Sequence, residues 1–174
     1  AKEDSLVAGL PLIAVVLGRM GCRDAQATLL ASDGDEVARG AEVARILGPA
    51  PILLKAERVI MNFICRLSGV ANATRRFVRA VEGTGVRVLD TRKTTPGLRH
   101  LEKYAVLMGG GHNHRMDLEE MLMLKDNHID QAGSITAAVA ALRKAYSPCP
   151  PLEIECRTLE HVREAVGHAP QRIM

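Results

Sequence analysis

The stretch VLDTRKTTPGLRHLEKYAV, residues 88–106, decides the fold, because it joins an expected strand to an expected helix. The apolar pair Val88 and Leu89 predicts a short strand at 87–90, and residues 98–108 have the spacing of a helix. The loop between them carries one carboxylate, two cations and three hydroxyls. A plain connection needs only a turn residue or two, so this loop indicates a binding site.

The same order of strand and helix recurs along the second half of the chain. We expect strands at 121–125, 152–155 and 172–174, and helices at 135–146 and 158–166. Strands that alternate with helices predict βα units and a parallel sheet. No G-x-G-x-x-G follows any of these strands, which argues against a dinucleotide-binding fold and favours a barrel or part of one.

The first half has a different organisation. Short strands are expected at 26–31 and 42–47, with a turn at 32–35. A helix begins near residue 52, after two prolines, and we expect it to break near Gly69 and resume at 72–81. The chain starts and stops in mid-pattern, so we expect it to be trimmed at both ends.

Composition bounds the class of protein. Of the 174 residues, 47% are hydrophobic and only 2% aromatic, and the net charge is +3. A packed core is therefore expected, whereas weak charge and scarce aromatics argue against a nucleic-acid partner. Four cysteines without C-x-x-C spacing fit a reduced, cytoplasmic chain. The apolar run 6–17 is too short to span a membrane, so no membrane partner is expected.

Charged groups collect where the expected strands end. Residues 90–93 follow the first strand, residues 125–128 the second, and residues 153–155 close the third. In parallel α/β folds these loops meet at one face, where the chemistry is done. Lys125 follows an apolar run and must face a partner or a cavity. Glu155 either pairs with Lys125 or binds ribose hydroxyls or a metal, and both alternatives stay open.

Three glycines at 109–111 precede His112, Asn113, His114 and Arg115. The glycines, which follow the end of an expected helix, predict either a close approach of the backbone or unusual dihedral angles. The H-x-H pattern has no third ligand at metal spacing, whereas a guanidinium beside a histidine suits a carboxylate or phosphate. The acidic run 117–120 is expected to be a solvated helical turn.

Helical spacing places Arg58, Asn62 and Arg66 on one face of the long helix. Such a face is either an exposed polar stripe or a surface packed against another subunit.

Four stretches carry a resemblance to a known family: ERVIMNFICRLSGVANATRRF (57–77), DTRKTTPGLRHLEKYAVLMGGGHNHR (90–115), LKDNHI (124–129) and LEIEC (152–156). Their order and spacing resemble the quinolinate phosphoribosyltransferases, and the similarity covers nearly the whole chain. The long block that begins D-T-R-K-T-T-P-G is highly specific.

The resemblance implies an N-terminal α/β sandwich domain at 1–84, followed at 85–174 by the first part of an incomplete parallel TIM-like barrel. It implies transfer of phosphoribose from phosphoribosyl pyrophosphate to quinolinate with Mg²⁺. The products would be nicotinate mononucleotide, pyrophosphate and CO₂, on the route to NAD. It also implies a homodimer or larger assembly.

The same resemblance implies roles for individual side chains. Those expected to bind quinolinate are Arg58 from the neighbouring subunit, Thr91, Arg92, His114 and Arg115. Those expected to meet the anionic groups of the substrates and to serve catalysis are Lys93 and Lys125, together with Glu155, which would lie by the ribose hydroxyls and Mg²⁺.

Two rival interpretations remain. A related enzyme could use the same scaffold on another pyridine carboxylate, but Arg92 and Arg115 supply two cationic clamps, and a nicotinate-specific site would need only one. The chain could also be an inactive anion-binding fragment, because the family continues beyond residue 174 with further strands.

Overall fold

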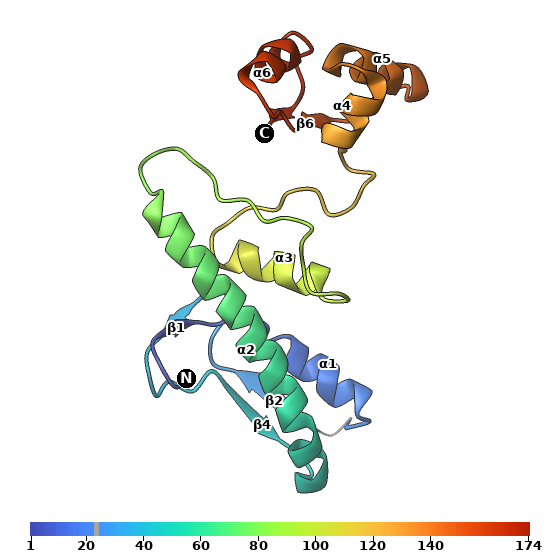
Figure 1. Cartoon of the computed structure of the whole chain (residues 1–174). Coiled ribbons are helices and arrows are strands. Elements are labelled where there is room, and N and C mark those ends of the chain that lie inside the picture. Colours follow the sequence, from blue (N-terminus) through green and yellow to red (C-terminus); the bar gives the residue numbers. More distant parts are fainter. Residues whose placement is uncertain (23–24) are drawn as a thin grey trace. The chain divides into compact units, whose positions relative to one another are not determined.

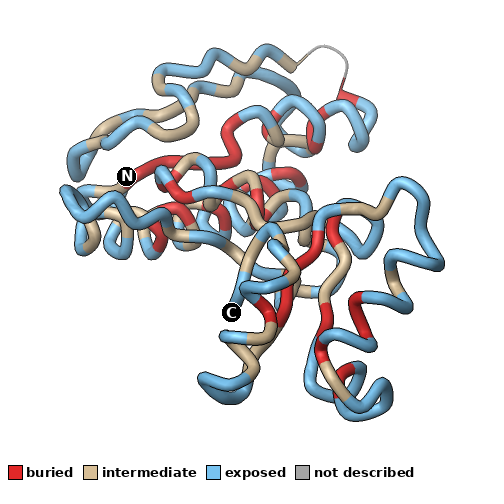
Figure 2. The backbone as a smooth tube through the Cα atoms, turned by 90° about the horizontal axis from the view of Figure 1, so that it is seen from above, coloured by how far each residue is buried: buried red, intermediate tan, exposed pale blue. Residues whose placement is uncertain are grey.

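The computed structural model describes residues 1–22 and 25–174. These residues form two compact units, residues 1–114 and residues 115–174 (Figure 1). Each has its own hydrophobic core, and buried stretches occur in both (Figure 2).

Unit 1 combines small antiparallel sheets with helices. Strand β1 (Ser5–Leu6) pairs with β3 (Glu36–Val37), and β2 (Gln26–Leu29) pairs with β4 (Ala44–Leu47). The helices are α1 (Leu12–Arg19), α2 (Ala50–Ala80) and α3 (Arg99–Met108). The expected strands in residues 26–31 and 42–47 are confirmed, and so is the helix that begins near residue 98.

Helix α2 is the element against which the rest of unit 1 packs. Near its start, Ala56 and Ile60 join a core with α1 residues such as Ile13. Further along, Leu67 and Ala71 join a second core with α3. The predicted break near residue 69 is wrong, because the burial of these flanking residues outweighs the cost of one helical glycine, about 1 kcal/mol.

Two short local predictions in the middle of the chain are also wrong. Residues 87–90 form no strand but a single parallel bridge between Leu89 and His112. Residues 117–120 form no helical turn. There the Asp117 carboxylate accepts hydrogen bonds from the amides of Glu119 and Glu120, at 2.8 and 3.1 Å, and so offers the backbone an alternative to a helix.

Unit 2 is a parallel sheet of order β5-β6-β7 with helices between its strands. The strands are β5 (Leu122–Leu124), β6 (Leu152–Ile154) and β7 (Arg172–Ile173). The helices are α4 (Asp126–Ala132), α5 (Ile135–Ala145) and α6 (Leu159–Val166). The predicted alternation of strand and helix is confirmed, except that α4 was not expected directly after a strand.

The register of unit 2 separates an apolar face of the sheet from a polar one. Leu124 pairs with Ile154, and both belong to the core that also contains Ile129 and Val139 from the helices. Since side chains alternate along a strand, Glu153 points to the opposite face, where it pairs with Arg172 at 3.8 Å. Lys125 and Glu155, two of the candidate site residues, directly follow β5 and β6 at the ends of these strands.

Candidate functional site

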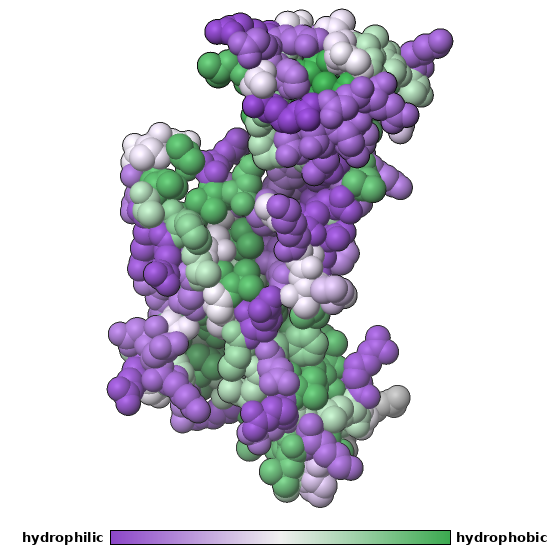
Figure 3. Space-filling model, viewed as in Figure 1, coloured by the Kyte–Doolittle hydropathy of each residue, from purple (hydrophilic) through white to green (hydrophobic). Residues whose placement is uncertain are grey.

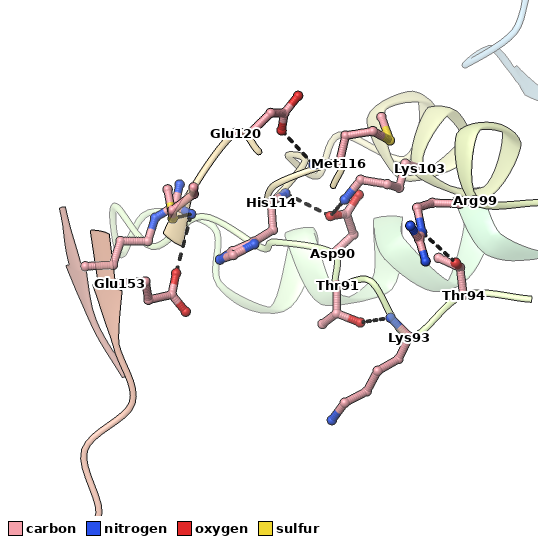
Figure 4. A network of polar contacts seen from close by, with 12 residues as sticks. Asp90, Thr91, Lys93, Thr94, Arg99, Lys103, His114, Met116, Glu120 and Glu153 are labelled. Atoms are coloured by element: carbon pink, nitrogen blue, oxygen red, sulfur yellow. Dashed lines mark hydrogen bonds and ion pairs between the residues drawn. The ribbon is translucent and has the colours of Figure 1, made fainter. Parts of the chain in front are cut away.

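The loop of residues 90–98 is fixed at its first residue. The Asp90 carboxylate forms an ion pair with the Lys103 ammonium of α3 and accepts a hydrogen bond from the His114 amide at 2.8 Å (Figure 4). When the Asn113 side-chain amide is oriented with its nitrogen toward Asp90, it donates to the second carboxylate oxygen at 2.7 Å. Asp90 therefore joins three segments of unit 1.

The same loop is held again five residues later. The Glu102 carboxylate accepts from the Thr95 amide at 3.1 Å and from the Arg66 guanidinium at 2.6 and 3.0 Å. Arg66 also donates to the Thr95 hydroxyl at 2.8 Å. Burial raises the pKa of Glu102, but these hydrogen bonds outweigh that effect and bring its pKa below the usual value.

Between the two anchors lie the cations that the sequence singled out. The Thr91 hydroxyl accepts from the Lys93 amide at 3.0 Å, and the exposed Lys93 side chain extends away from the Asp90–Lys103 pair (Figure 4). Arg92 is partly buried, and its Nε has no hydrogen-bond partner among the described residues. A buried donor of this kind is suited to an anionic ligand.

The glycine run sets the position of the segment that carries His114. A Cβ added to Gly109 would lie 2.5 Å from the Ala71 carbonyl oxygen, and one added to Gly111 would lie 2.8 Å from the Thr74 side chain. The expectation of a close backbone approach is thus confirmed. Only glycine allows the segment after α3 to lie directly on α2.

Unit 2 contains the remaining strand-end residues. The Lys125 ammonium, after β5, lies 3.5 Å from the Glu155 carboxylate, after β6. Both side chains are almost half exposed, at 47% and 41%, so solvent weakens the pair and leaves both groups accessible. Arg115 donates to the Met121 carbonyl at 2.6 Å.

The structure therefore groups the expected site residues within each unit. Thr91, Arg92, Lys93 and His114 belong to the anchored loops of unit 1. Arg115, Lys125 and Glu155 belong to unit 2. Arg58 is exposed on α2, whereas Arg66 from the same helical face binds Glu102.

Sequence reasoning missed the buried charges of α3. Lys103 is 0% exposed, and Glu102 is nearly as buried. The available signal was Glu102 three residues before Ala105, and so on the helical face of a core residue. Lys103 does not share that face, and helical spacing gave no signal for its burial. The next residue, Tyr104, donates to Asp33 at 2.8 Å, and burial together with this carboxylate raises its pKa to about 12.

These features define a class of protein: a mixed α/β chain whose strand-end loops present several cations, suited to small anionic ligands. The model of the quinolinate phosphoribosyl transferase N-terminal domain matches residues 1–68, and that of the C-terminal domain matches residues 70–174. The chain belongs to the quinolinate phosphoribosyltransferase family.

Individual relatives agree with this assignment. The probable nicotinate-nucleotide pyrophosphorylases (carboxylating) of Bacillus subtilis and a Synechocystis species are each 43% identical over 174 residues. The alignments cover 100% of this chain but 60% and 59% of those proteins. The crystal structure of NadC from Streptococcus pyogenes is 40% identical, with a TM-score of 0.93 over 100% of this chain and 61% of that one.

The chain thus spans about three fifths of the length of these relatives. Within the described residues, no helix is long and apolar enough to cross a membrane.

Proposed function

We propose that the protein containing this chain transfers phosphoribose from phosphoribosyl pyrophosphate to quinolinate and releases CO₂. Its products would be nicotinate mononucleotide and pyrophosphate, within NAD biosynthesis. Membership of the family supports the reaction, and the names of the two bacterial relatives describe the same chemistry.

One observation carries the proposal most directly. The loop of residues 90–98 is anchored at Asp90 and at Thr95, and it presents Arg92 and Lys93 between these anchors. The partly buried Arg92 keeps a donor that no described residue uses. A cation held in place before its ligand arrives loses less conformational entropy on binding, which suits recognition of a carboxylate.

Quinolinate carries two carboxylates and so requires two cationic contacts. We assign these to Arg92 and Arg115, with His114 and Thr91 positioning the ring and Arg58 arriving from the neighbouring subunit. A guanidinium can donate two parallel hydrogen bonds to a carboxylate, which gives orientation as well as affinity.

The remaining residues suit the pyrophosphate donor. When pyrophosphate departs, negative charge grows on the leaving oxygens and positive charge on the ribose carbon. Lys93 and Lys125 would stabilise the first, and Glu155 would lie beside the ribose. Ribosylation of the pyridine nitrogen creates the electron sink for decarboxylation, so the protein mainly positions its substrates.

The residues present fit a magnesium ion that arrives with the pyrophosphate donor. Among the described residues there is no group of three or more histidine, cysteine or acidic side chains suited to hold a metal. Mg²⁺ is commonly bound by one or two carboxylates together with substrate phosphates, and the accessible Glu155 supplies one carboxylate. Bound there, the ion would neutralise charge on the leaving group.

We also propose the larger architecture. The three parallel strands of unit 2, with a polar sheet face, suit part of a TIM-like barrel within residues 85–174, after a sandwich domain in residues 1–84. Exposed apolar side chains, Leu47 and Leu54 among them, gather near the start of α2 (Figure 3) and suit a subunit interface next to Arg58. Four free cysteines suit the cytoplasm.

The test uses the full-length protein that contains this chain. Incubated with quinolinate, phosphoribosyl pyrophosphate and Mg²⁺, it should form nicotinate mononucleotide, measured by chromatography, and release CO₂. A protein that is folded but forms no product under these conditions would contradict the proposal.

The Arg115→Ala variant tests the assigned role of one clamp. It should weaken quinolinate binding by about tenfold or more, and binding of the pyrophosphate donor much less, because it removes a charged hydrogen bond to one substrate only. Arg163→Ala is the matched control, since Arg163 is an exposed arginine of unit 2 whose side chain pairs with Glu160 at the surface. Equal weakening for both substrates would contradict the role.

A further inference from the structure

Two consecutive residues of α3 hold both ends of the cation-bearing loop. Lys103 forms its ion pair with Asp90, where the loop begins. Glu102 accepts from the Thr95 amide, five residues further along the loop. Arg92 and Lys93 lie between these two attachments, so any movement of α3 relative to the loop would move both cations.

The first attachment is almost fully removed from water. The Lys103 side chain is 0% exposed and that of Asp90 is 6% exposed. A buried ion pair is weak evidence for stability, because an apolar pair of similar size often serves as well. A hydrogen-bonded ion pair can also fix one geometry of the backbone. An apolar contact does this poorly, because hydrophobic contacts have no preferred direction.

The geometry that Asp90 fixes involves two segments of the candidate site. One carboxylate oxygen accepts from the His114 amide at 2.8 Å and also contacts Lys103. The second accepts from the reoriented Asn113 amide at 2.7 Å. Through this one side chain, the loop that carries Arg92 and the segment that carries His114 hold a set position relative to each other.

The second attachment connects the loop to α2. Arg66 of α2 donates to both Glu102 and Thr95, so α2, α3 and the loop meet in one hydrogen-bonded cluster. Glu102 is nearly buried, with a side chain 10% exposed, whereas Arg66 is 53% exposed. The carboxylate is therefore the fixed member of this cluster.

We propose that Lys103 and Glu102 are positioning residues, which hold the two ends of the loop so that Arg92 is fixed to meet a dianionic pyridine ligand, with Lys93 held beside it to meet the pyrophosphate donor. Neither residue touches the ligand. The inference rests on the proposed function for the identity of that ligand, but the restraint on the loop is a property of this chain alone.

The main test is a double variant of the full-length protein, Asp90→Leu with Lys103→Met. Removing both charges leaves no unpaired buried charge, so the fold should persist. The dissociation constant for quinolinate, measured by calorimetry, should rise about tenfold or more, because the cations lose their spacing. Cleavage by trypsin after Arg92 and Lys93 should accelerate by a similar factor, because the released loop opens more often.

A second variant covers the other attachment and does not depend on the first. Glu102→Gln keeps an acceptor for the Thr95 amide but loses the charge that faces Arg66. We expect a smaller rise in the dissociation constant, about two- to fivefold, and faster tryptic cleavage in the loop.

The matched control is Tyr104→Phe. Tyr104 follows Lys103 directly on α3, but its hydroxyl contacts Asp33 and not the loop. The variant loses the hydrogen bond to Asp33 but leaves the loop attached, so quinolinate affinity and loop cleavage should stay at the wild-type values. This control separates a loss of positioning from a general weakening of α3.

The outcomes separate two kinds of failure. If folded double and Glu102→Gln variants bind quinolinate as tightly as the wild type and are cut no faster, the positioning role is overturned. If the wild type neither binds nor converts quinolinate, the proposed function fails, whereas the tryptic cleavage rates still decide whether these residues restrain the loop.

Discussion

At the scale of single residues, Tyr104 gives unit 1 a dependence on alkaline pH. Its hydroxyl donates to Asp33, and the same carboxylate accepts from the amides of Gly9 and Leu10, at 2.8 and 2.9 Å. Tyr104 therefore links α3 to the segment before α1. The pKa of about 12 means that the folded protein holds the phenol proton more tightly than the unfolded chain does.

We expect Tyr104→Phe to lower the free energy of unfolding by about 1 kcal/mol near neutral pH, the usual value of one hydrogen bond. The contribution of Tyr104 should be complete below pH 10, the ordinary tyrosine pKa, and should disappear as the pH rises toward 12. The difference in stability between wild type and variant should shrink over the same range. Urea denaturation at several pH values measures it.

Phenolate absorbance provides the control, because the sequence holds only two tyrosines and no tryptophan. The titration step near pH 12 should be absent from Tyr104→Phe and present in Tyr146→Phe, which removes the exposed tyrosine. A step near pH 12 that survives Tyr104→Phe would contradict the assignment.

At the scale of elements, the contact between α2 and the glycine run controls where the His114 segment lies. We expect Gly109→Ala to destabilise the protein by about 1–3 kcal/mol, because the new Cβ would lie 2.6 Å from the Cβ of Thr74 and closer still to an α2 carbonyl. Chemical denaturation of the full-length protein measures the change.

Gly69→Ala is the matched control within α2. A Cβ at this position meets nothing within 4 Å, so the substitution should stabilise the helix by up to about 1 kcal/mol. Equal effects of the two substitutions would show that close packing does not decide the conformation of the glycine run.

Helices and strands were predictable where the apolar residues of a segment followed a single helical or strand spacing. The apolar spacing of α2 and the strand–helix alternation of unit 2 are local signals, and both are found in the structure. The strand predicted at 87–90 is absent and a single bridge stands in its place, because pairing depends on a partner segment that local sequence does not reveal. Helix α4 was missed because residues 125–128 were considered only as a charged strand end, although the His128 ring accepts from the Lys125 amide and caps the helix.

The candidate site was predictable as a set of polar residues at strand ends, but its supports were not. The Lys125–Glu155 pair was one of two alternatives left open by the sequence, and register brings the two residues together, because Leu124 pairs with Ile154 directly before them. The role of Glu155 toward ribose or a metal stays a prediction. The burial of Lys103 depends on α3 packing over Asp90, a contact between residues 13 positions apart. Whether these residues act as assigned stays a prediction.

At the scale of the whole molecule, the exposed Arg58 raises the question of which active site it serves. We expect Arg58→Ala and Lys93→Ala each to abolish most activity. When the two inactive proteins are mixed and allowed to exchange subunits, hybrid dimers would contain one complete site. Random exchange should then restore about a quarter of the wild-type activity.

Exchange with an exposed surface variant tests the specificity of this rescue. A mixture of Arg45→Ala and Lys93→Ala should show only the activity of the Arg45→Ala subunits, because Arg45 contacts Glu42 at the surface and serves no site. If the mixture of Arg58→Ala and Lys93→Ala stays inactive although subunits exchange, Arg58 does not act across an interface.

The buried pair of Asp90 and Lys103 also constrains how this protein can evolve. Changing either residue alone leaves an opposite charge buried without its partner, at a cost of about 3–5 kcal/mol, which is a large part of the stability of most domains. A lineage can reach an apolar pair only by two changes, with an impaired intermediate between them. We therefore expect these two positions to vary together among descendants of this sequence, and to vary rarely.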